Sequence, residues 1–311
     1  MAADPLSQVL ELLNARCRMS GGLVSGGPFS LRFQAHGIIK FSAVAEGGCW
    51  LLMDCLPVPR RLETGDVIVI DGRHPMVLAS DPALPPQDAH SAYTRRPGQD
   101  ATIGVGRDFR LLGGLVEIDH ARQDLLLDAL PPLIHVRGAA PEAIALRWLL
   151  EQMIAEIGHE RPGGEMATAQ LAQLMFMQAL RAHLGDAESD ARGWLRALGD
   201  ERIAPALRLM HGRPAHPWTL EQLAHAVAMS RTTFAERFKA AVGSAPLAYL
   251  RDWRMHLAER DLRESDTPVS SIAYAVGYTS ESAFSNAFKR MTNLAPQRYR
   301  TQAREAVAQP G

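Results

Sequence analysis

Hydrophobic residues are grouped differently in different parts of the chain. Between residues 28 and 120 they form short runs, such as 50–53 and 67–70, that are bounded by Gly, Pro and Asp. Short apolar runs separated by turn residues are typical of β-strands. Several strands at this spacing predict a β-barrel or sandwich. Four prolines in the stretch 81–100 favour a mobile loop there.

From Pro141 onward the hydrophobic period becomes helical. We expect two long helices at 141–159 and 165–184, broken by the proline and glycines of 161–164. Each has an apolar stripe, which predicts either burial in the core or a dimer interface, and both readings stay open. The stripe residues are Ile144, Trp148, Leu149 and Met153 on the first helix, and Leu171, Leu174, Met175 and 177–180 on the second.

Two segments frame these helices. Residues 185–192 are small, polar and charged, which is typical of a linker, and everything after Gly193 has a helical pattern. Residues 1–15 lack the basic and apolar regions of a signal peptide. They form an amphipathic pattern with Leu6, Val9, Leu10 and Leu13 on one side. No apolar stretch reaches the ~20 residues that span a bilayer, so we expect a cytoplasmic protein with no membrane contact.

A duplication of about 50 residues near the C-terminus is the most informative pattern. Its two copies align position by position, with an offset of 49 residues at first and 50 later, so their turns differ by one residue. The first copy contains Leu223, Ala224, Val227, Met229, Ser230, Phe234, Phe238-Lys239, Pro246 and Tyr249. The second contains Ile272, Ala273, Val276, Tyr278, Thr279, Phe284, Phe288-Lys289, Pro296 and Tyr299.

Each copy has the sequence signals of a helix-turn-helix. Thr219 and Gln222 predict a capping box at the start of the first helix, and Thr267-Pro268 is expected to start the equivalent helix in the second copy. A short turn follows, after which Ser230, and Thr279 or Ser280, are expected to cap the second helices. We expect these second helices to bury two phenylalanines each and to end at Gly243 and Asn293, residue types that tolerate a left-handed C-cap.

The alternative to this interpretation is a plain helical bundle. The presence of two matched copies, joined by a helix over 246–262, strongly disfavours that alternative. Charge supports the helix-turn-helix reading weakly. The formal charge of the chain is −1, yet residues 200–311 contain 15 Lys plus Arg against 11 Asp plus Glu. A mildly basic end on an acidic body fits nucleic-acid binding.

With these motifs in place, residues 200–311 closely resemble the DNA-binding domain of the AraC/XylS family. The resemblance lies in 229–239 and 276–299, including the Gly277-Tyr278 turn and Pro296. It implies two helix-turn-helix units held by a linking helix, with both recognition helices in adjacent major-groove segments.

The N-terminal half resembles the cupin-like sensor that precedes this domain in one AraC subgroup. The matching residues are 4–7, 27–28, 46–47, 49–51, 65–66, His74, 130–132 and 193–195. The resemblance implies a small β-barrel that senses a signal, followed by helices that dimerise. We therefore expect an α+β multidomain chain, with a cupin-like sensor over 1–138, a helical linker and dimerisation segment over 139–192 and the DNA-binding domain over 193–311.

The candidate DNA contacts follow from helix geometry and from the resembled family. Helix N-termini suit phosphates, so Ser230, Arg231, Thr279 and Ser280 are expected at the DNA backbone. The family pattern assigns base reading to Thr232, Ala235 and Glu236 in the first copy and to Glu281, Ser282 and Asn286 in the second. Ser285 is a further candidate DNA contact. Lys239, Lys289 and Arg290, with Arg237, Arg298 and Arg300, are candidates for further phosphate contacts or solvated charges.

Asparagine can bond adenine at two atoms, and glutamate can accept from a cytosine amino group. Ala235 can offer a base only an apolar contact. For Glu236 and Glu281, a solvated helix charge is an equal alternative.

A cupin barrel can also hold a metal, which raises the alternative of an enzyme. Metal-binding cupins usually have a His-x-His on one strand, whereas the corresponding strand here, 41–46, has no histidine. Two separate imidazoles, His36 and His74, do not make a stable site, so we expect no metal, no cofactor and no catalytic residue. His74 and Trp50 are candidates for the effector pocket, with a turn hydrogen bond and a core position as their respective alternatives.

Three cysteines, Cys17, Cys49 and Cys55, are too few for a disulfide framework or a zinc site. They are expected to be small buried or half-buried thiols, with a redox switch as the alternative.

Together these patterns predict a transcription factor that binds double-stranded DNA, forms a homodimer and responds to an unidentified small-molecule or stress effector. RNA polymerase is a further candidate partner. Two alternatives remain open from sequence: a cupin-type metal enzyme with a helical appendage, and a constitutive DNA-binding protein with a structural barrel.

Overall fold

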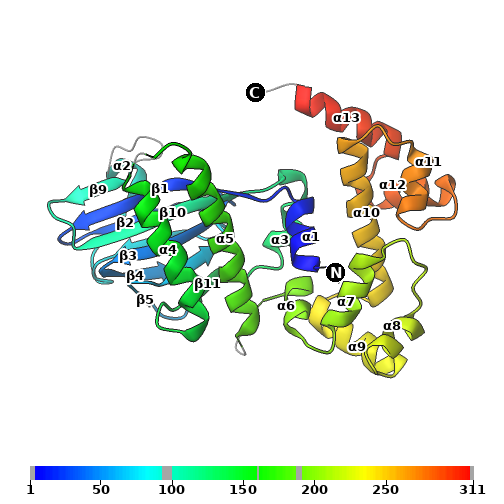
Figure 1. Cartoon of the computed structure of the whole chain (residues 1–311), viewed down its shortest axis with the longest axis horizontal. Coiled ribbons are helices and arrows are strands. Elements are labelled where there is room, and N and C mark those ends of the chain that lie inside the picture. The colour runs from blue at the N-terminus through cyan, green and yellow to red at the C-terminus, as the bar shows by residue number, and fades with distance from the viewer. Residues whose placement is uncertain (1–3, 93–99, 160, 187–190, 309–311) are drawn as a thin grey trace. The chain divides into compact units, whose positions relative to one another are not determined.

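The computed structural model describes residues 4–92, 100–159, 161–186 and 191–308. The chain divides into two compact units (Figure 1). Residues 14–191 form one, and residues 1–13 together with 192–311 form the other. Residues 93–99 of the expected mobile loop and 187–190 of the expected linker lie outside the described residues.

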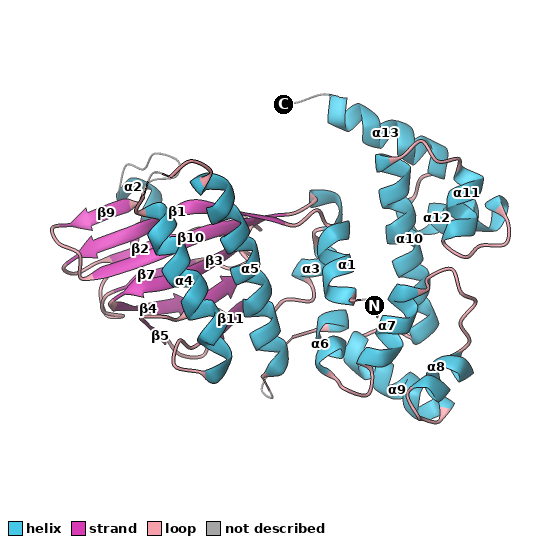
Figure 2. Ribbon diagram, viewed as in Figure 1, coloured by secondary structure: helices cyan, strands magenta, loops and turns pink. Residues whose placement is uncertain are grey.

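The first unit contains the expected β structure as two sheets (Figure 2). A six-stranded sheet has the order β11-β6-β3-β10-β1-β9, and a five-stranded sheet has the order β5-β4-β7-β2-β8. The strands are β1 (Arg16–Gly26), β2 (Ser30–Phe33), β3 (Ile39–Glu46), β4 (Gly48–Met53), β5 (Arg60–Glu63), β6 (Val67–Ile70), β7 (Met76–Ala79), β8 (Gln87–Asp88), β9 (Ala101–Gly104), β10 (Phe109–Glu117) and β11 (Leu133–Val136). Short helical segments, α2 (Ala89–Ala92), η1 (His120–Arg122) and α3 (Asp124–Leu127), lie between strands.

One hydrophobic core is formed by side chains from both sheets. Leu31, Leu51 and Leu78 contribute from the five-stranded sheet, and Val44 and Ile68 from the six-stranded sheet. Successive side chains of a strand point to opposite faces, so each inward leucine leaves its sequence neighbours on the outer face. That alternation determines which residues of β2, β4 and β7 are available at the surface.

The two long helices that the pattern predicted are present, and both pack against the six-stranded sheet. They are α4 (Ile144–Ile157), which follows a 3-10 turn η2 (Pro141–Ala143), and α5 (Gly164–Gly185). Helix α5 contacts β1, β6 and β11, and α4 contacts β3. The backbone N–H of Cys17 on β1 donates to Gln173 Oε1 on α5 at 2.9 Å. The stripe expected on α4 is divided, because Leu149 and Met153 are buried while Ile144 and Trp148 are 64% and 54% exposed.

Asp66 joins the turn before β6 to the end of β11. Its carboxylate accepts from the backbone N–H groups of Glu63 and Gly138 at 3.0 and 2.8 Å, and it contacts His135 Nε2 at 2.8 Å. Burial favours the protonated acid, but these hydrogen bonds outweigh it, and the pKa of Asp66 is lowered. Gly65 beside it has φ +90°, a conformation that favours glycine. Gly65 and Asp66 thus hold the turn before β6 to the end of β11 in the six-stranded sheet.

The second unit is helical. Its helices are α1 (Pro5–Leu12), α6 (Gly193–Gly199), α7 (Ala204–Gly212), α8 (Leu220–Ala226), α9 (Arg231–Val242), α10 (Pro246–Glu264), α11 (Val269–Ala275), α12 (Glu281–Thr292) and α13 (Pro296–Ala308). They enclose two separate cores, one per repeat. Leu250 of α10 belongs to the first core, and Met255, Ala258 and Leu262 of α10 belong to the second. A single continuous helix therefore fixes one repeat relative to the other.

The N-terminal helix α1 lies in this second unit, where it packs against α7 and α10. The sequence predicted a sensor over 1–138 that includes this helix, whereas the contacts of α1 lie within the helical unit. Asp4 caps the helix through a bond from the Leu6 N–H, and Val9 and Leu10 on its apolar side are buried. The β unit is consequently joined to the helical unit at both of its ends, at residues 13–14 and 191–192.

A buried polar contact accompanies the docking of α1. His211 of α7 lies between Gln8 Oε1, 3.2 Å from Nδ1, and the Tyr249 hydroxyl, 2.7 Å from Nε2. Its ring stacks on Trp253 with 4.0 Å between ring centroids. Burial lowers the pKa of His211 to about 3 and raises the pKa of Tyr249. The neutral imidazole therefore donates from Nδ1 to Gln8 and accepts from the tyrosine hydroxyl.

Candidate nucleic-acid interface

The first repeat forms its helix-turn-helix with the capping residues that the sequence predicted. Thr219 and Gln222 make a capping box at α8, with N···O distances of 3.0 and 3.2 Å. Ser230 caps α9 by accepting from the Thr233 N–H at 3.2 Å, and Gly243 ends the helix with φ +88°. The first turn of α9 therefore presents backbone N–H groups and the positive end of the helix dipole.

The second repeat settles which residue caps its recognition helix. Ser280 accepts from the Ala283 N–H at 3.2 Å, so it and not Thr279 is the N-cap of α12. Asn293 ends this helix with φ +61°, as expected. The predicted start of α11 at Thr267-Pro268 is wrong by one residue. Pro268 is the N-cap and has extended backbone, and no side chain caps the helix.

Each repeat has one turn residue in the left-handed conformation, but the type of that residue differs between the repeats. Ala228 has φ +51° in the first turn, and Gly277 has φ +87° in the second. A Cβ on Gly277 would lie 2.6 Å from the Ala215 carbonyl oxygen, so only glycine fits there. In the first repeat a non-glycine residue is held in the left-handed conformation, which costs stability.

Buried phenylalanines fix which face of each recognition helix points outward. Phe234 and Phe238 of α9 are fully buried, and so are Phe284 and Phe288 of α12. Residues on the opposite face remain accessible. The exposed predicted site residues are Ser230, Arg231, Thr232, Glu236, Lys239, Thr279, Glu281, Ser282, Asn286, Lys289 and Arg290, while Ala235, Ser280 and Ser285 are half-buried. Both faces are thus open to a ligand at the predicted positions.

The other arginines considered for phosphate contact differ in their surroundings. Arg237 forms a two-bond ion pair with Asp200, at 3.0 and 3.2 Å, which holds α9 against the chain before α7. Asp200 is partly buried, but the bonds from Arg237 and from the Arg202 N–H dominate and lower its pKa. Arg300 donates to the Thr267 carbonyl oxygen, and Arg298 is exposed. Sequence reasoning gave no sign of the Arg237–Asp200 pair, since its residues are 37 positions apart.

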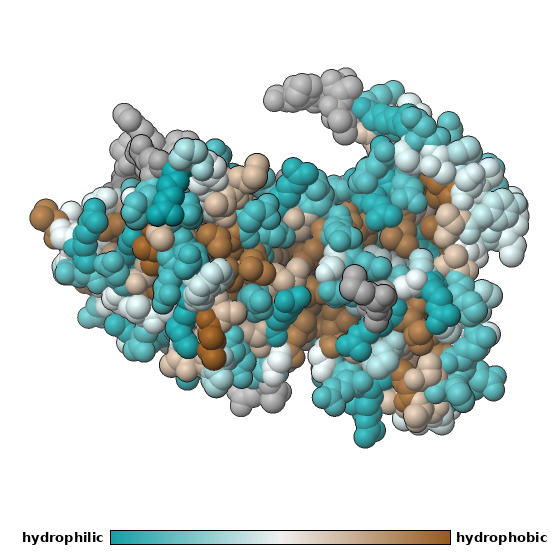
Figure 3. Space-filling view, viewed as in Figure 1, coloured by the Kyte–Doolittle hydropathy of each residue, from teal (hydrophilic) through white to brown (hydrophobic). Residues whose placement is uncertain are grey.

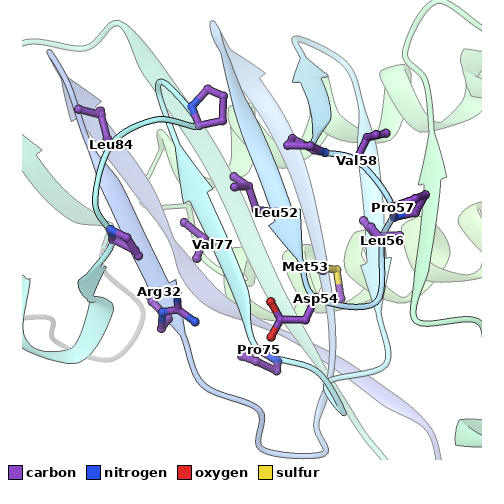
Figure 4. Close-up of a pocket in the computed structure, with 13 residues that line it drawn as sticks. Arg32, Leu52, Met53, Asp54, Leu56, Pro57, Val58, Pro75, Val77 and Leu84 are labelled. Carbon is purple, nitrogen blue, oxygen red and sulfur yellow. The ribbon is translucent and has the colours of Figure 1, made fainter.

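The β unit has a pocket on the outer face of its five-stranded sheet (Figure 4). Its volume is about 390 Å³, and it is lined by Arg32, Leu52 and Val77 of the sheet, by residues in 53–59 and 82–86, and by Pro75. Trp50 and His74, the predicted effector residues, are not among the lining residues. Trp50 instead lies 5.6 Å from the Arg61 guanidinium, at cation–π distance.

Cysteine chemistry is limited by burial. Cys17 and Cys49 are buried, and desolvation raises the pKa of each thiol to about 12. Both are protonated at neutral pH and are therefore poor nucleophiles. Cys55 is exposed. Within the described residues no group of three or more His, Cys, Asp or Glu is placed to hold a metal ion, and no helix is long and apolar enough to cross a membrane.

Two helix-turn-helix pairs, each with a serine-capped recognition helix, are joined along α10 and preceded by a two-sheet β unit. This arrangement defines a two-domain DNA-binding protein. Residues 4–185 match a family model described as a cupin, and residues 223–302 match one described as a helix-turn-helix domain. A Streptomyces antibioticus protein named as an AraC-like transcription regulator is 41% identical over 297 residues, which cover 96% of this chain and 98% of that protein. The chain belongs to this family of AraC-like transcription regulators, with a cupin domain at its N-terminus.

Two further comparisons cover part of the chain. The transcriptional regulator AlkR of Acinetobacter baylyi is 38% identical over 181 residues, covering 57% of this chain and 58% of AlkR. The DNA-binding domain of AdpA, solved in complex with a target DNA, is 33% identical, and the match covers 34% of this chain and 96% of that one with a TM-score of 0.33.

Proposed function

We propose that this protein regulates transcription by placing α9 and α12 in successive major-groove segments of one operator, in response to a signal sensed by the β unit. One observation supports this most directly. Both recognition helices are capped by serine, anchored by buried phenylalanines and joined by the single helix α10. The pair can therefore dock as one body. We place the protein in the cytoplasm, where it would meet DNA and RNA polymerase.

In this proposal the two helices share backbone contacts but read different bases. Ser230 and Arg231 at α9, and Thr279 and Ser280 at α12, meet phosphates through side chains and free N–H groups. Lys239, Lys289 and Arg290 add charge along the DNA backbone. The base-reading positions are Thr232, Ala235 and Glu236 on α9 and Glu281, Ser282 and Asn286 on α12, and Ser285 is a further DNA contact on α12. The family's relatives favour this function over a cupin enzyme.

The operator for one subunit is expected to have two subsites with different sequences, about one turn or ~10 bp apart, because rigidly joined helices enter successive grooves at that spacing. Selection of binding fragments from random double-stranded DNA with the full chain tests this. Bound sequences with a single short motif, or with two motifs at freely varying spacing, would contradict docking of the two helices as one body.

We further propose that the protein forms a homodimer through α4 and α5. These helices expose large apolar side chains on the surface shown in Figure 3. Trp148 and Ile144 lie one turn apart on α4, and Met166 and Leu174 of α5 are 74% and 42% exposed. Exposed apolar residues on neighbouring helices are typical of interfaces between subunits.

Trp148→Glu combined with Ile144→Glu is expected to convert the dimer to a monomer, because two charges would be buried without partners at its interface. Sedimentation of the full chain at tens of micromolar measures this. Gln34→Glu, at an exposed position outside α4 and α5, is the matched control and should leave the dimer intact. A wild-type chain that sediments as a monomer, with or without operator DNA, would refute the dimer.

A further inference from the structure

The pocket on the five-stranded sheet has a floor formed by one row of side chains. Arg32 of β2 pairs in register with Val77 of β7, and Val77 pairs with Leu52 of β4. Their sequence neighbours Leu31, Leu51 and Leu78 point into the core between the sheets. The row therefore belongs to the outer face, with two apolar residues followed by one cation.

Two proline-rich segments form the walls of this pocket. Residues 54–59 and 81–86 contain five prolines, which fix φ and leave little backbone entropy to be lost when a ligand binds. The second segment is tied down by hydrogen bonds: Ser30 Oγ donates to the Leu84 carbonyl at 3.2 Å, and Asp81 accepts from the Ala83 N–H at 2.9 Å. The walls are apolar and pre-formed, and the volume lies within the range of small-molecule sites.

Two opposite charges face one another at the end of the pocket near Pro75. Figure 4 shows the guanidinium of Arg32 and the carboxylate of Asp54 pointing toward each other from the two sides. They form no ion pair with each other or with any other described residue. By contrast, Arg110 and Arg73 in the same unit are paired with Asp100 and Asp128, at 3.4 and 2.7 Å. A ligand group placed between Arg32 and Asp54 meets one cation and one anion.

From this arrangement we infer that the pocket binds a small zwitterion of the apolar α-amino-acid class, whose carboxylate contacts Arg32 and whose ammonium contacts Asp54. The apolar side chain lies on Leu52 and Val77 between the proline walls. A simple carboxylate satisfies Arg32 and is repelled by Asp54, and an amine has the opposite conflict. Only a ligand with both charges at one end satisfies both residues. The inference rests on the proposed sensing function, because it names the class of signal.

Three probes of nearly the same size separate the contributions of the two charges. L-Phenylalanine has both, 3-phenylpropionate lacks the ammonium and 2-phenylethylamine lacks the carboxylate. Calorimetric titration of the full chain, without DNA, is expected to show L-phenylalanine binding at least about fivefold more tightly than either analogue, a modest factor because both protein charges are exposed. Equal binding of 3-phenylpropionate would overturn the zwitterion assignment, and no binding of any probe would overturn the site.

Substitutions then assign each charge to its partner. Arg32→Gln should weaken L-phenylalanine and 3-phenylpropionate but not 2-phenylethylamine, and Asp54→Asn should weaken L-phenylalanine and 2-phenylethylamine but not 3-phenylpropionate. Arg60→Gln and Glu63→Gln, on β5 outside the lining residues, are the matched controls and should change none of the three affinities. Substitutions at Arg32 or Asp54 that weaken all three probes equally would contradict the assignment.

DNA binding by each variant is measured separately, so loss of the ligand and loss of the proposed function are distinguishable. Variants that bind operator DNA like the wild type but no longer bind L-phenylalanine support the pocket. Ligand binding that leaves operator affinity unchanged supports the site and contradicts its role as a sensor. A chain that binds ligand but no DNA sequence specifically leaves the pocket in place and refutes the proposed function.

Discussion

Val9→Asp is expected to destabilise the DNA-binding unit by about 3–5 kcal/mol, the usual cost of an uncompensated charge in a protein interior. Val9 has no exposed surface, although it is only nine residues from the start of the chain. The helix that contains it packs on α7 and α10 of the DNA-binding unit. A charge at this position must therefore either become buried or release α1 from that unit, and each outcome weakens the fold around His211.

Urea unfolding followed by tryptophan fluorescence measures this effect. Trp194, Trp218 and Trp253 lie in the helical unit, so Trp50→Phe and Trp148→Phe restrict the signal to it. Glu11→Ala, at an exposed position of the same helix, is the control and should change the free energy of unfolding by less than ~0.5 kcal/mol. If Val9→Asp left the unfolding of the helical unit unchanged, the packing of α1 on α7 and α10 would be contradicted.

The position of α1 shows what a hydrophobic pattern determines and what it leaves open. Leu6, Val9, Leu10 and Leu13 correctly indicated a helix with one apolar side. Such a side requires a partner, but the pattern does not specify which surface provides it, because hydrophobic attraction is non-directional. Sequence adjacency to the β-strands suggested the sensor, whereas the contacts of the helix are with α7 and α10. Gln8, a polar residue of this helix, is half-buried and lies 3.2 Å from His211 Nδ1.

The helix-turn-helix units were predictable in much finer detail because their signals are local. A cap, a turn and two phenylalanines four residues apart lie within about one helix length of each other, and Ser230, Gly243 and Asn293 all adopt the expected caps. The start of α11 was missed because Pro at a helix start fits two adjacent positions. Long-range features, such as the ion pair between Arg237 and Asp200, depend on tertiary packing, so the spacing of residues along the sequence does not predict them.

The pocket on the five-stranded sheet is a third case, because the sequence contains its lining residues but does not indicate that they lie together. Trp50 and His74 were predicted as candidates for the effector pocket and belong to the residues that resemble the cupin-like sensor. The lining of the pocket comes instead from the row across β2, β7 and β4 and from two loops. Strand order in a sheet with crossovers does not follow sequence order. The register that brings Arg32 to Val77 could not be derived from either strand alone.

Specificity of the second subsite provides the sharpest test of the DNA interface. Asn286 is exposed on α12, one turn after Ser282 and on the side opposite the buried Phe284 and Phe288. An asparagine there can bond adenine at two atoms. Asn286→Ala is therefore expected to cost roughly 1–3 kcal/mol in operator binding and to relax the preference at one base pair of one subsite only.

Arg231→Ala should behave differently, because Arg231 lies at the exposed N-terminal end of α9, where phosphate contacts form. Its loss should weaken binding about equally on all sequences and reduce the salt dependence by about one phosphate contact. Titrations of both variants against a library of single-base operator changes distinguish the two roles. Gln297→Ala, an exposed amide on α13, is the matched control for Asn286. If Asn286→Ala weakened every operator variant equally, Asn286 would be a backbone contact or a folding residue, and the reading face proposed for α12 would be wrong.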